Sequence, residues 1–257
     1  MPLDYARALT APHRTQRANR HLGLALAFIA GAINAGGFVA VHQYTSHVTG
    51  MASSIANDVA FGGSALALDA CGAIFSFLCG AACSAVMVHF ARRRAWAAEY
   101  ALPLLLEAVL LLAFGVLGAR LADIQGLFIP VTVMLLCFMM GLQNALVTDL
   151  SKAAIRTTHM TGTVTDIGIE LGKLLYWNAD PDCAQPRVVA DRSRIQLLCG
   201  LFACFVTGGV AGTWAFAHMG YAATLPLAAF LCILAITPAV DDLRRFARRG
   251  ATRTPRP

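Results

Sequence analysis

Two copies of one six-residue pattern occur in this sequence, and each copy follows a long apolar run. Residues 45–50 read TSHVTG and residues 157–162 read TTHMTG, and the apolar runs before them end in GAINA (31–35) and GLQNA (141–145). Each histidine is followed after 11 positions by an acidic residue, Asp58 or Glu170. Eleven residues make about three helical turns, so each copy places a histidine and a carboxylate on one helix face. The sequence therefore predicts an internal duplication.

Composition and the length of the apolar runs indicate a membrane protein. Hydrophobic residues make up 58% of the chain and charged residues 13%, against roughly 45–50% and 25% in soluble domains. Six apolar blocks are each about 20 residues long, enough to cross a hydrocarbon core of roughly 30 Å. They are residues 22–42, 70–90, 101–119, 126–147, 195–217 and 221–240. We predict an all-α polytopic membrane protein with six transmembrane helices in the lipid bilayer.

The basic residues predict how the chain is oriented. All except Arg120, which follows the third block, lie before the first block, directly after the second (Arg92, Arg93, Arg94), between the fourth and fifth, or after the sixth. With the N-terminus inside, all these segments are cytoplasmic, as the positive-inside rule requires. We therefore expect both termini to lie in the cytoplasm. The first block, which follows several arginines, also has features of a signal peptide, but its counterpart at 126–147 favours a transmembrane helix.

The duplication divides the chain into four parts. These are a basic N-terminal arm (1–21), a first three-span repeat (22–120), a second three-span repeat (121–240) and a basic C-terminal tail (241–257). An odd number of spans turns the chain over, so the second repeat enters the membrane from the opposite side. We expect a 3+3 inverted repeat about an axis in the membrane plane.

The segments after the two motifs, 51–67 and 163–177, are predicted to be helical but are shorter than the six blocks. If both crossed the membrane, Arg92 to Arg94 would lie outside, against the positive-inside rule. We therefore favour re-entrant helices. An eight-span arrangement and amphipathic helices on the membrane surface remain alternatives.

The two motifs supply the candidate pathway residues. Threonine can cap a helix, glycine permits close approach, and a helix N-terminus presents free amides and partial positive charge to a solute. Histidine can donate, accept or carry a proton, although a structural hydrogen bond is the alternative role. Asparagine in a span needs a partner, in helix packing or on a solute. The candidates are Asn34, Thr45, His47, Thr49, Gly50, Asn144, Thr157, His159, Thr161 and Gly162.

Four carboxylates are candidates for proton or cation coupling. Asp58 matches Glu170, and Asp166 is an additional acid on the second copy. Lys173 follows Glu170 by three residues and can form an ion pair with it. Glu107 lies about two turns into the third block without a counterpart in the sixth. Intramembrane carboxylates commonly carry protons or ions; the alternatives are a solvated interfacial helix face and, for Glu107, contact with water at the cytoplasmic surface.

Other ligand classes have little support in the sequence. Seven of the eight cysteines fall inside the apolar blocks and no C-x-x-C pair occurs, so we expect no metal site and no cofactor. The net charge of +6 arises from residues next to the membrane. Contact with anionic lipid explains that charge without nucleic acid.

The GAINA end of the first span, the T-G turn after a histidine and above all GLQNALVTDLSKAAIRTTHMTGTVTDIGIELGK (141–173) resemble the YoaK-like family of bacterial inner-membrane proteins. The resemblance covers about 22–240 and implies about six spans and a transporter of unknown substrate. The family pattern usually has aspartate at the position of Asn34 and asparagine at that of Met51. These departures make Asp58, Asp166 and Glu170 the better candidates for coupling.

Together these features favour a membrane transporter or permease for a small polar or anionic solute, with protons as a second partner. Its site would lie between two inverted repeats, and a channel is a close variant. An intramembrane enzyme using His159 with Asp166 or Glu170 is an alternative, although no nucleophile or metal motif accompanies these residues. A membrane scaffold or sensor that transports nothing is the other alternative.

Overall fold

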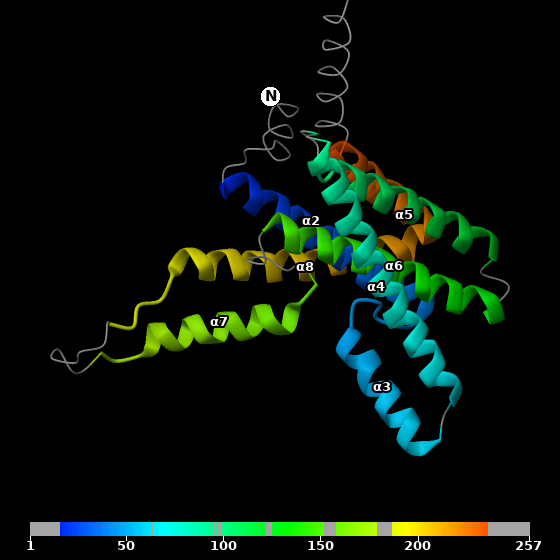
Figure 1. Cartoon of the computed structure of the whole chain (residues 1–257), viewed down its shortest axis with the longest axis horizontal. Helices are drawn as coiled ribbons and strands as arrows, with labels where there is room; N and C mark the ends of the chain where they lie inside the picture. Colours follow the sequence, from blue (N-terminus) through cyan, green and yellow to red (C-terminus); the bar gives the residue numbers. More distant parts are fainter. Residues whose placement is uncertain are drawn as a thin grey trace, which may run out of the picture.

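The computed structural model describes residues 16–62, 64–94, 96, 99–121, 125–151, 158–178 and 187–235. Most of the N-terminal arm, the C-terminal tail and Thr157 lie outside these residues. All regular structure in the described part is helical (Figure 1). The elements are α2 (Gln16–Val41), α3 (Val48–Phe61), α4 (Ser64–Arg93), α5 (Ala101–Leu121), α6 (Gln125–Leu150), α7 (Met160–Leu175), α8 (Arg192–Met219) and the 3-10 turn η1 (Gly220–Ala223), followed by helical residues 224–235.

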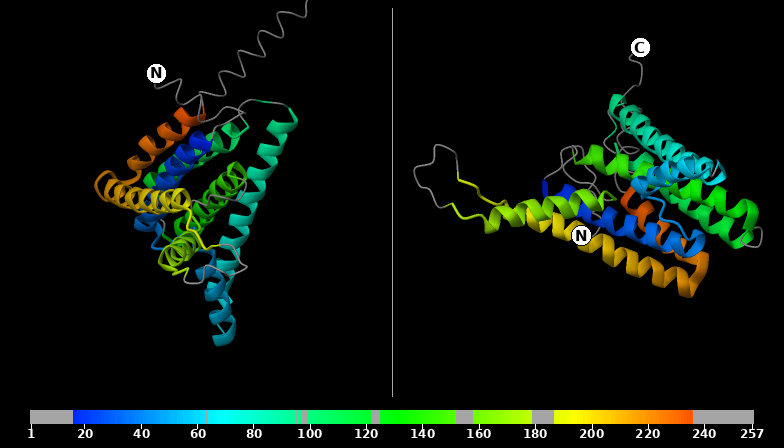
Figure 2. Two further views of the ribbon diagram at one scale, coloured as in Figure 1. Left: turned by 90° about the vertical axis from the view of Figure 1, so that its left-hand side faces the viewer. Right: turned by 90° about the horizontal axis from the view of Figure 1, so that it is seen from below.

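Five helical stretches in the described part are long and apolar enough to cross a membrane. They are Arg20–Val41, Ala67–Arg93, Ala101–Arg120, Pro130–Leu150 and Arg192–Ala235. The last has 44 residues and includes both α8 and residues 224–235, with η1 between them. At η1 the chain turns: Tyr221 contacts Gly118 and Thr224 contacts Gly115, so this segment runs antiparallel to α5 (Figure 2). The chain is therefore a polytopic membrane protein, and the fifth stretch contains the fifth predicted block and residues 221–235 of the sixth, whose last five residues lie outside the described ones.

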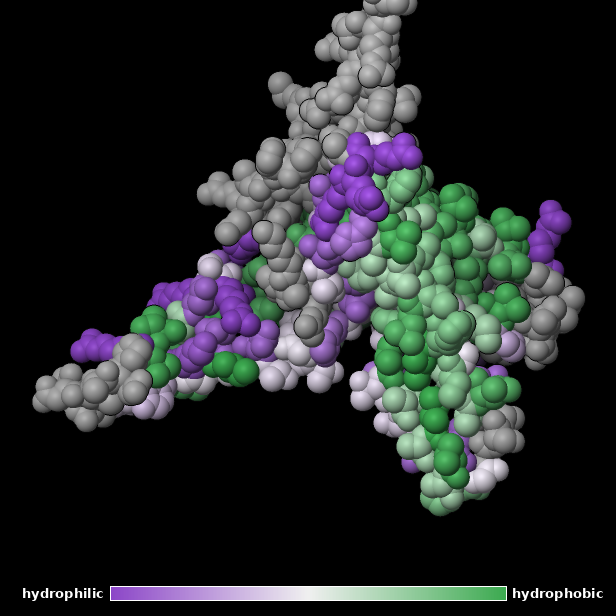
Figure 3. All heavy atoms as spheres, in the orientation of Figure 1, coloured by the Kyte–Doolittle hydropathy of each residue, from purple (hydrophilic) through white to green (hydrophobic). Residues whose placement is uncertain are grey.

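The helices that follow the two motifs are not among these candidate spans. α3 has 14 residues and α7 has 16, and each begins three residues before the segment predicted from the sequence. Each forms a hairpin with the first half of the helix after it, and both hairpins project from the helix bundle (Figure 1). The α3–α4 hairpin presents a largely apolar surface (Figure 3), which includes Val59, Phe61 and Leu68.

α2 and α8 lie in backbone contact along their length. A side chain at Gly31 of α2 would collide with the carbonyl oxygen of Phe205, and one at Gly208 of α8 with the carbonyl oxygen of Phe28. Only glycine leaves room for helices to approach this closely. Leu24 lies beside Gly200, and Gly36 lies beside Phe216 further along both helices, so α2 and α8 run parallel.

α4 and α6 repeat this arrangement. A side chain at Gly80 would collide with the carbonyl oxygen of Phe138, and one at Gly141 with the carbonyl oxygen of Phe77. The Ser76 hydroxyl donates to the Met134 carbonyl at 2.6 Å. These two helices also run parallel, because their C-terminal ends are joined: the Arg92 guanidinium pairs with the Asp149 carboxylate.

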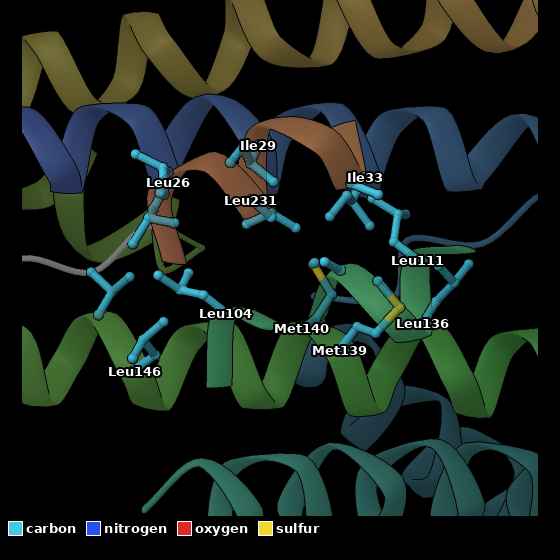
Figure 4. Packing of buried hydrophobic residues seen from close by; sticks show 14 of the residues in the cluster. Leu26, Ile29, Ile33, Leu104, Leu111, Leu136, Met139, Met140, Leu146 and Leu231 are labelled. Carbon is cyan, nitrogen blue, oxygen red and sulfur yellow. The ribbon is translucent and has the colours of Figure 1, made fainter. Parts of the chain in front are cut away.

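The two helix pairs meet through α2 and α6, which run antiparallel. The Gln143 side-chain amide donates to the Leu26 carbonyl at 3.1 Å, and Leu136 lies against Gly37, further along α2 but earlier along α6. Between α2, α5, α6 and residues 224–235 lies the buried core (Figure 4). It includes Leu26, Ile29, Ile33, Leu104, Leu111, Leu136, Met139, Met140, Leu146 and Leu231.

The glycine contacts predict a local sensitivity to added volume. Gly31→Ala and Gly208→Ala should each lower the free energy of unfolding by roughly 1–3 kcal/mol, because backbones in contact must move apart. Gly168→Ala is the matched control, since nothing lies within 4 Å of an added Cβ there; it should be neutral or stabilise by up to about 1 kcal/mol through helix propensity. Thermal unfolding in detergent tests this, and equal melting temperatures for all three variants would contradict it.

Candidate functional site

The first motif is held against the side of α2 by one asparagine. The side-chain oxygen of Asn34 accepts from the Ser46 backbone N–H at 3.2 Å and from the Ser46 hydroxyl at 3.0 Å. α2 continues for seven residues beyond Asn34 to Val41, which is about 10 Å at 1.5 Å per residue. The chain therefore folds back over this length before α3 begins.

The second motif has the same attachment. The Thr158 hydroxyl donates to the side-chain oxygen of Asn144 at 3.0 Å, and α6 continues for six residues beyond Asn144 to Leu150. Asn34 and Asn144 each tie the residue before a motif histidine to a span, and a solute contact for either asparagine stays a prediction. Thr157 lies outside the described residues.

The helix starts differ from the predicted threonine caps. The N-cap residues are His47 for α3 and His159 for α7, and neither side chain makes a capping hydrogen bond. Their backbones are nearly the same, with φ and ψ of −93° and 65° at His47 and of −85° and 61° at His159. The threonine prediction is wrong because the chain folds back to the asparagine one residue before each histidine, which leaves histidine at the cap.

The remaining motif residues surround these caps. Thr45 is buried and its hydroxyl has no partner among the described residues, whereas Thr49 and Thr161 are exposed. The His47 ring lies over the first turn of α3, where a Cβ added at Gly50 would be 2.5 Å from its Nδ1. At Gly162 the corresponding distance to the His159 ring is 3.4 Å. Gly50 therefore permits a closer histidine contact than Gly162 does.

Beside the first motif lies a cavity of about 490 Å³, which we call the α3 cavity. It is bordered by the end of α2, the loop after it, α3, the first half of α4 and the start of α6, and it is open on one side. Its polar lining includes His42, Gln43, Tyr44, His47, Ser54, Asn57, Asp58 and Asp69. The second half of the chain contributes Pro130, Val133 and Met134 of α6, so the structure does not place both motifs in this one cavity.

Among the described residues, the lining of the α3 cavity contains acidic groups but no lysine or arginine. One carboxylate oxygen of Asp58 is buried without a hydrogen-bond partner in the described part of the chain. Asp69 faces the same cavity from α4. A carboxylate oxygen that loses water without gaining a partner is costly, so this lining favours a ligand that donates hydrogen bonds.

Sequence reasoning missed several residues of this cavity. His42 ends α2 with φ of 54°, in the left-handed region that is uncommon for residues other than glycine and is often found at functional sites. Phe38 and Tyr44 stack with ring centroids 4.5 Å apart. His42 closes the first apolar block and Asp69 precedes the second, so both looked like ordinary ends of spans. An ionisable residue at each end of the segment between the first two apolar blocks was the available signal.

In the second copy, lysine and arginine side chains form ion pairs with both carboxylates. We call this arrangement the α7 ion-pair network. Glu170, only 2% exposed, binds the Lys173 ammonium at 2.8 Å, as predicted from their spacing. It also accepts from the Asp191 backbone N–H at 2.9 Å. The Arg194 guanidinium lies 3.1 Å from Asp166 and 3.8 Å from Glu170. The hydrogen bonds from Lys173 and Asp191 hold the pKa of the Glu170 carboxyl below its ordinary value.

Glu107 is fully buried in α5, with 0% of its surface exposed. Neither carboxylate oxygen has a hydrogen-bond partner among the described residues. The side chain therefore does not reach water in this structure, which removes the interpretation of Glu107 as a residue at the cytoplasmic surface. A coupling role for it stays a prediction.

The Asn34 bonds predict a test of the first helix start. Asn34→Ala removes the acceptor of two hydrogen bonds and should cost about 1–3 kcal/mol of stability. Asn34→Asp retains an acceptor oxygen at this position and should cost less. Thermal unfolding of the two variants measures the difference, and an alanine variant as stable as the aspartate variant would show that the turn does not depend on this side chain.

The lowered pKa of Glu170 predicts a pH-dependent contribution to stability. Because the folded pKa is below the unfolded one, the contribution is present above the unfolded value of about 4.3 and is lost as pH falls through the folded pKa. Glu170→Gln should therefore melt below the wild type at pH 7, and the gap should narrow as pH falls below about 4.3. A gap that stays constant down to pH 3.5 would contradict the ion-pair explanation.

Comparison with known proteins agrees with this architecture. Residues 22–237 match a family described as "Protein of unknown function (DUF1275)". The chain is also similar to the UPF0700 transmembrane protein YoaK of Bacillus subtilis (strain 168), with 25% identity over 155 residues that cover 59% of this chain and 67% of that protein. No solved structure matches. The YoaK-like resemblance inferred from the motifs is thus confirmed, and this multi-pass membrane protein belongs to the DUF1275 family.

Proposed function

We propose that this protein is a secondary transporter that moves a small polar solute between two inverted repeats. The observation that carries the proposal is the pair of interrupted helix starts, His47 and His159, each bound back to the flank of a span through an asparagine. Irregular backbone inside a membrane is tolerated only where protein buries it or it lines a watery cavity. Half-helices that begin inside the membrane are a recurrent way to build a solute site.

The packing supports an inverted relation between the copies. In each copy, the glycine of the G-x-x-N-A sequence packs against a phenylalanine carbonyl of the other copy: Gly31 against Phe205, and Gly141 against Phe77. The corresponding helices α2 and α6 run antiparallel, as three crossings per copy require. Four crossings per copy would return the chain to the same side and make α2 and α6 parallel, so this contact argues against the eight-span arrangement.

The depth of the helix starts also supports a membrane pathway. The two contacts between α2 and α6 bracket Gly31 and Met140, which places these residues near the middle of the bundle. Asn34 and Asn144 lie three and four residues beyond them, about 5–6 Å from the middle on opposite sides. Half of the hydrocarbon core is about 15 Å thick. Both helix starts, with their free amides, would then lie within the apolar layer and approach it from opposite faces.

The two copies differ in a way that suits alternating access. Beside α3 a cavity is open, whereas the face of α7 is closed by the α7 ion-pair network. With both termini in the cytoplasm of a bacterium, as the basic residues favour, the α3 cavity opens to the outside. An enzyme that uses His159 with Asp166 or Glu170 is less well supported, because cationic side chains engage both carboxylates.

Side-specific thiol labelling tests the inverted arrangement. Single cysteines replace Ser46 and Thr158 in a cysteine-free protein, which is labelled with a membrane-impermeant maleimide in intact and inverted vesicles. We expect the two positions to label from opposite sides. Labelling from the same side would overturn the inverted repeat.

Solute flux then tests transport itself. His47→Ala and His159→Ala should each slow solute uptake into vesicles at least about tenfold, the usual effect of losing one positioned polar group. The melting temperature of His47→Ala should change little, because the His47 side chain does not cap its helix. Uptake that survives both substitutions would remove the motif from the pathway.

A further inference from the structure

In the second copy, side chains of the protein itself provide the cations that pair with the motif-helix carboxylates. Its two motif-helix carboxylates, Asp166 and Glu170, are held by nitrogen cations of the same chain, from Lys173 and Arg194. The cations lie at 2.8 Å and 3.1 Å, within charge-assisted hydrogen-bond range. This face of α7 is therefore a site for ammonium and guanidinium groups that the protein fills by itself.

The first copy keeps the carboxylate and lacks the cations. Asp58 occupies the position of Glu170, but the position of Lys173 is Phe61. Aligned through Cys71 and Cys199, Arg194 corresponds to Leu66. The carboxylate without an internal cation is the one whose Oδ2 is buried and unpartnered in the described part of the chain. In place of the cations the first copy has the α3 cavity.

We propose that the α3 cavity binds a small organic cation carrying an ammonium or guanidinium group. The proposal deepens the proposed transport function and rests on it for the solute's passage. Asp58 on α3 and Asp69 on α4 provide the countercharge from two facing helices. The solute's nitrogen takes the place that Lys173 and Arg194 fill in the second copy, so an anion is excluded by charge.

The rest of the lining suits an organic cation better than a metal ion. Phe38 and Tyr44, stacked at an interplanar angle of 21°, both line the cavity, and aromatic rings attract ammonium and guanidinium groups. The Asn57 side chain adds an amide oxygen that accepts N–H groups. Within the described ranges, no group of three or more His, Cys, Asp or Glu side chains is arranged to hold a metal. The volume of about 490 Å³ falls in the range of small-molecule sites.

Binding to the purified full-length protein in lipid nanodiscs tests the proposal. The probe is agmatine, which carries one ammonium and one guanidinium group, and the matched probes of similar length are adipate and hexane-1,6-diol. Calorimetry should detect agmatine binding, and adipate and the diol should bind with at least about tenfold lower affinity. Asp58→Asn and Asp69→Asn, which keep side-chain shape, should each weaken agmatine at least about tenfold. Asp191→Asn removes a carboxylate outside the cavity and should leave agmatine binding unchanged.

A charge supplied by the protein provides a sharper test. Phe61→Lys places a lysine three residues after Asp58, the spacing of Glu170 and Lys173. It should fill the site internally and weaken agmatine at least about tenfold, while Phe61→Gln, of similar length and uncharged, should not. Phe61 is 89% exposed, so both variants should fold, and melting curves check that they do.

The outcomes separate the two proposals. Agmatine that binds no tighter than adipate or the diol, or as tightly to Asp58→Asn and Asp69→Asn as to the wild type, overturns the organic-cation site. Agmatine that binds but is not taken up by vesicles overturns transport and leaves the binding site in place. Uptake of a neutral or anionic solute without agmatine binding overturns the organic-cation site and leaves transport in place.

Discussion

Backbone contact between glycine-bearing helices underlies the rest of this structure. Gly31 and Gly208 bring α2 and α8 together, and Gly80 and Gly141 do the same for α4 and α6. In lipid, apolar side chains gain little by meeting one another, so association depends on close packing and internal hydrogen bonds. Four positions without a side chain supply that closeness, and each pair joins one helix of the first copy to one of the second.

Because α2 pairs with α8 and α4 pairs with α6, the motif helices α3 and α7 lie at the edge of the bundle. α3 and α7 pack mainly against the first halves of α4 and α8, outside the glycine contacts. Their N-termini are nevertheless fixed to α2 and α6 through Asn34 and Asn144. A helix that is anchored at its start and lightly packed along its length can change its tilt without disturbing the core. Under the proposed transport function, such a hairpin would be the moving part of alternating access.

Charge distinguishes two copies that otherwise share their backbone. Glu170 is buried and satisfied by Lys173 and Asp191, whereas Asp58 borders a cavity with one oxygen unsatisfied. Glu170 therefore has a countercharge within the chain, and under the further proposal a cation from solution fills the corresponding place beside Asp58. The two motif copies thus differ in whether the described part of the chain supplies the countercharge.

Sequence alone determined the features that repeat locally: the positions of the apolar spans, the two motif helices, and the Glu170–Lys173 pair at one-turn spacing. Hydrophobic periodicity and residue spacing determine local structure within a few residues, so these features can be read from the sequence. The sequence did not determine that histidine rather than threonine would be the N-cap of each helix. That depends on the hydrogen bond from the folded-back loop to the asparagine side chain. Nor did the sequence determine that His42 and Asp69 would meet around one cavity, since they lie at the ends of different spans. Those features depend on which helices approach closely enough to touch, and only the tertiary packing decides that.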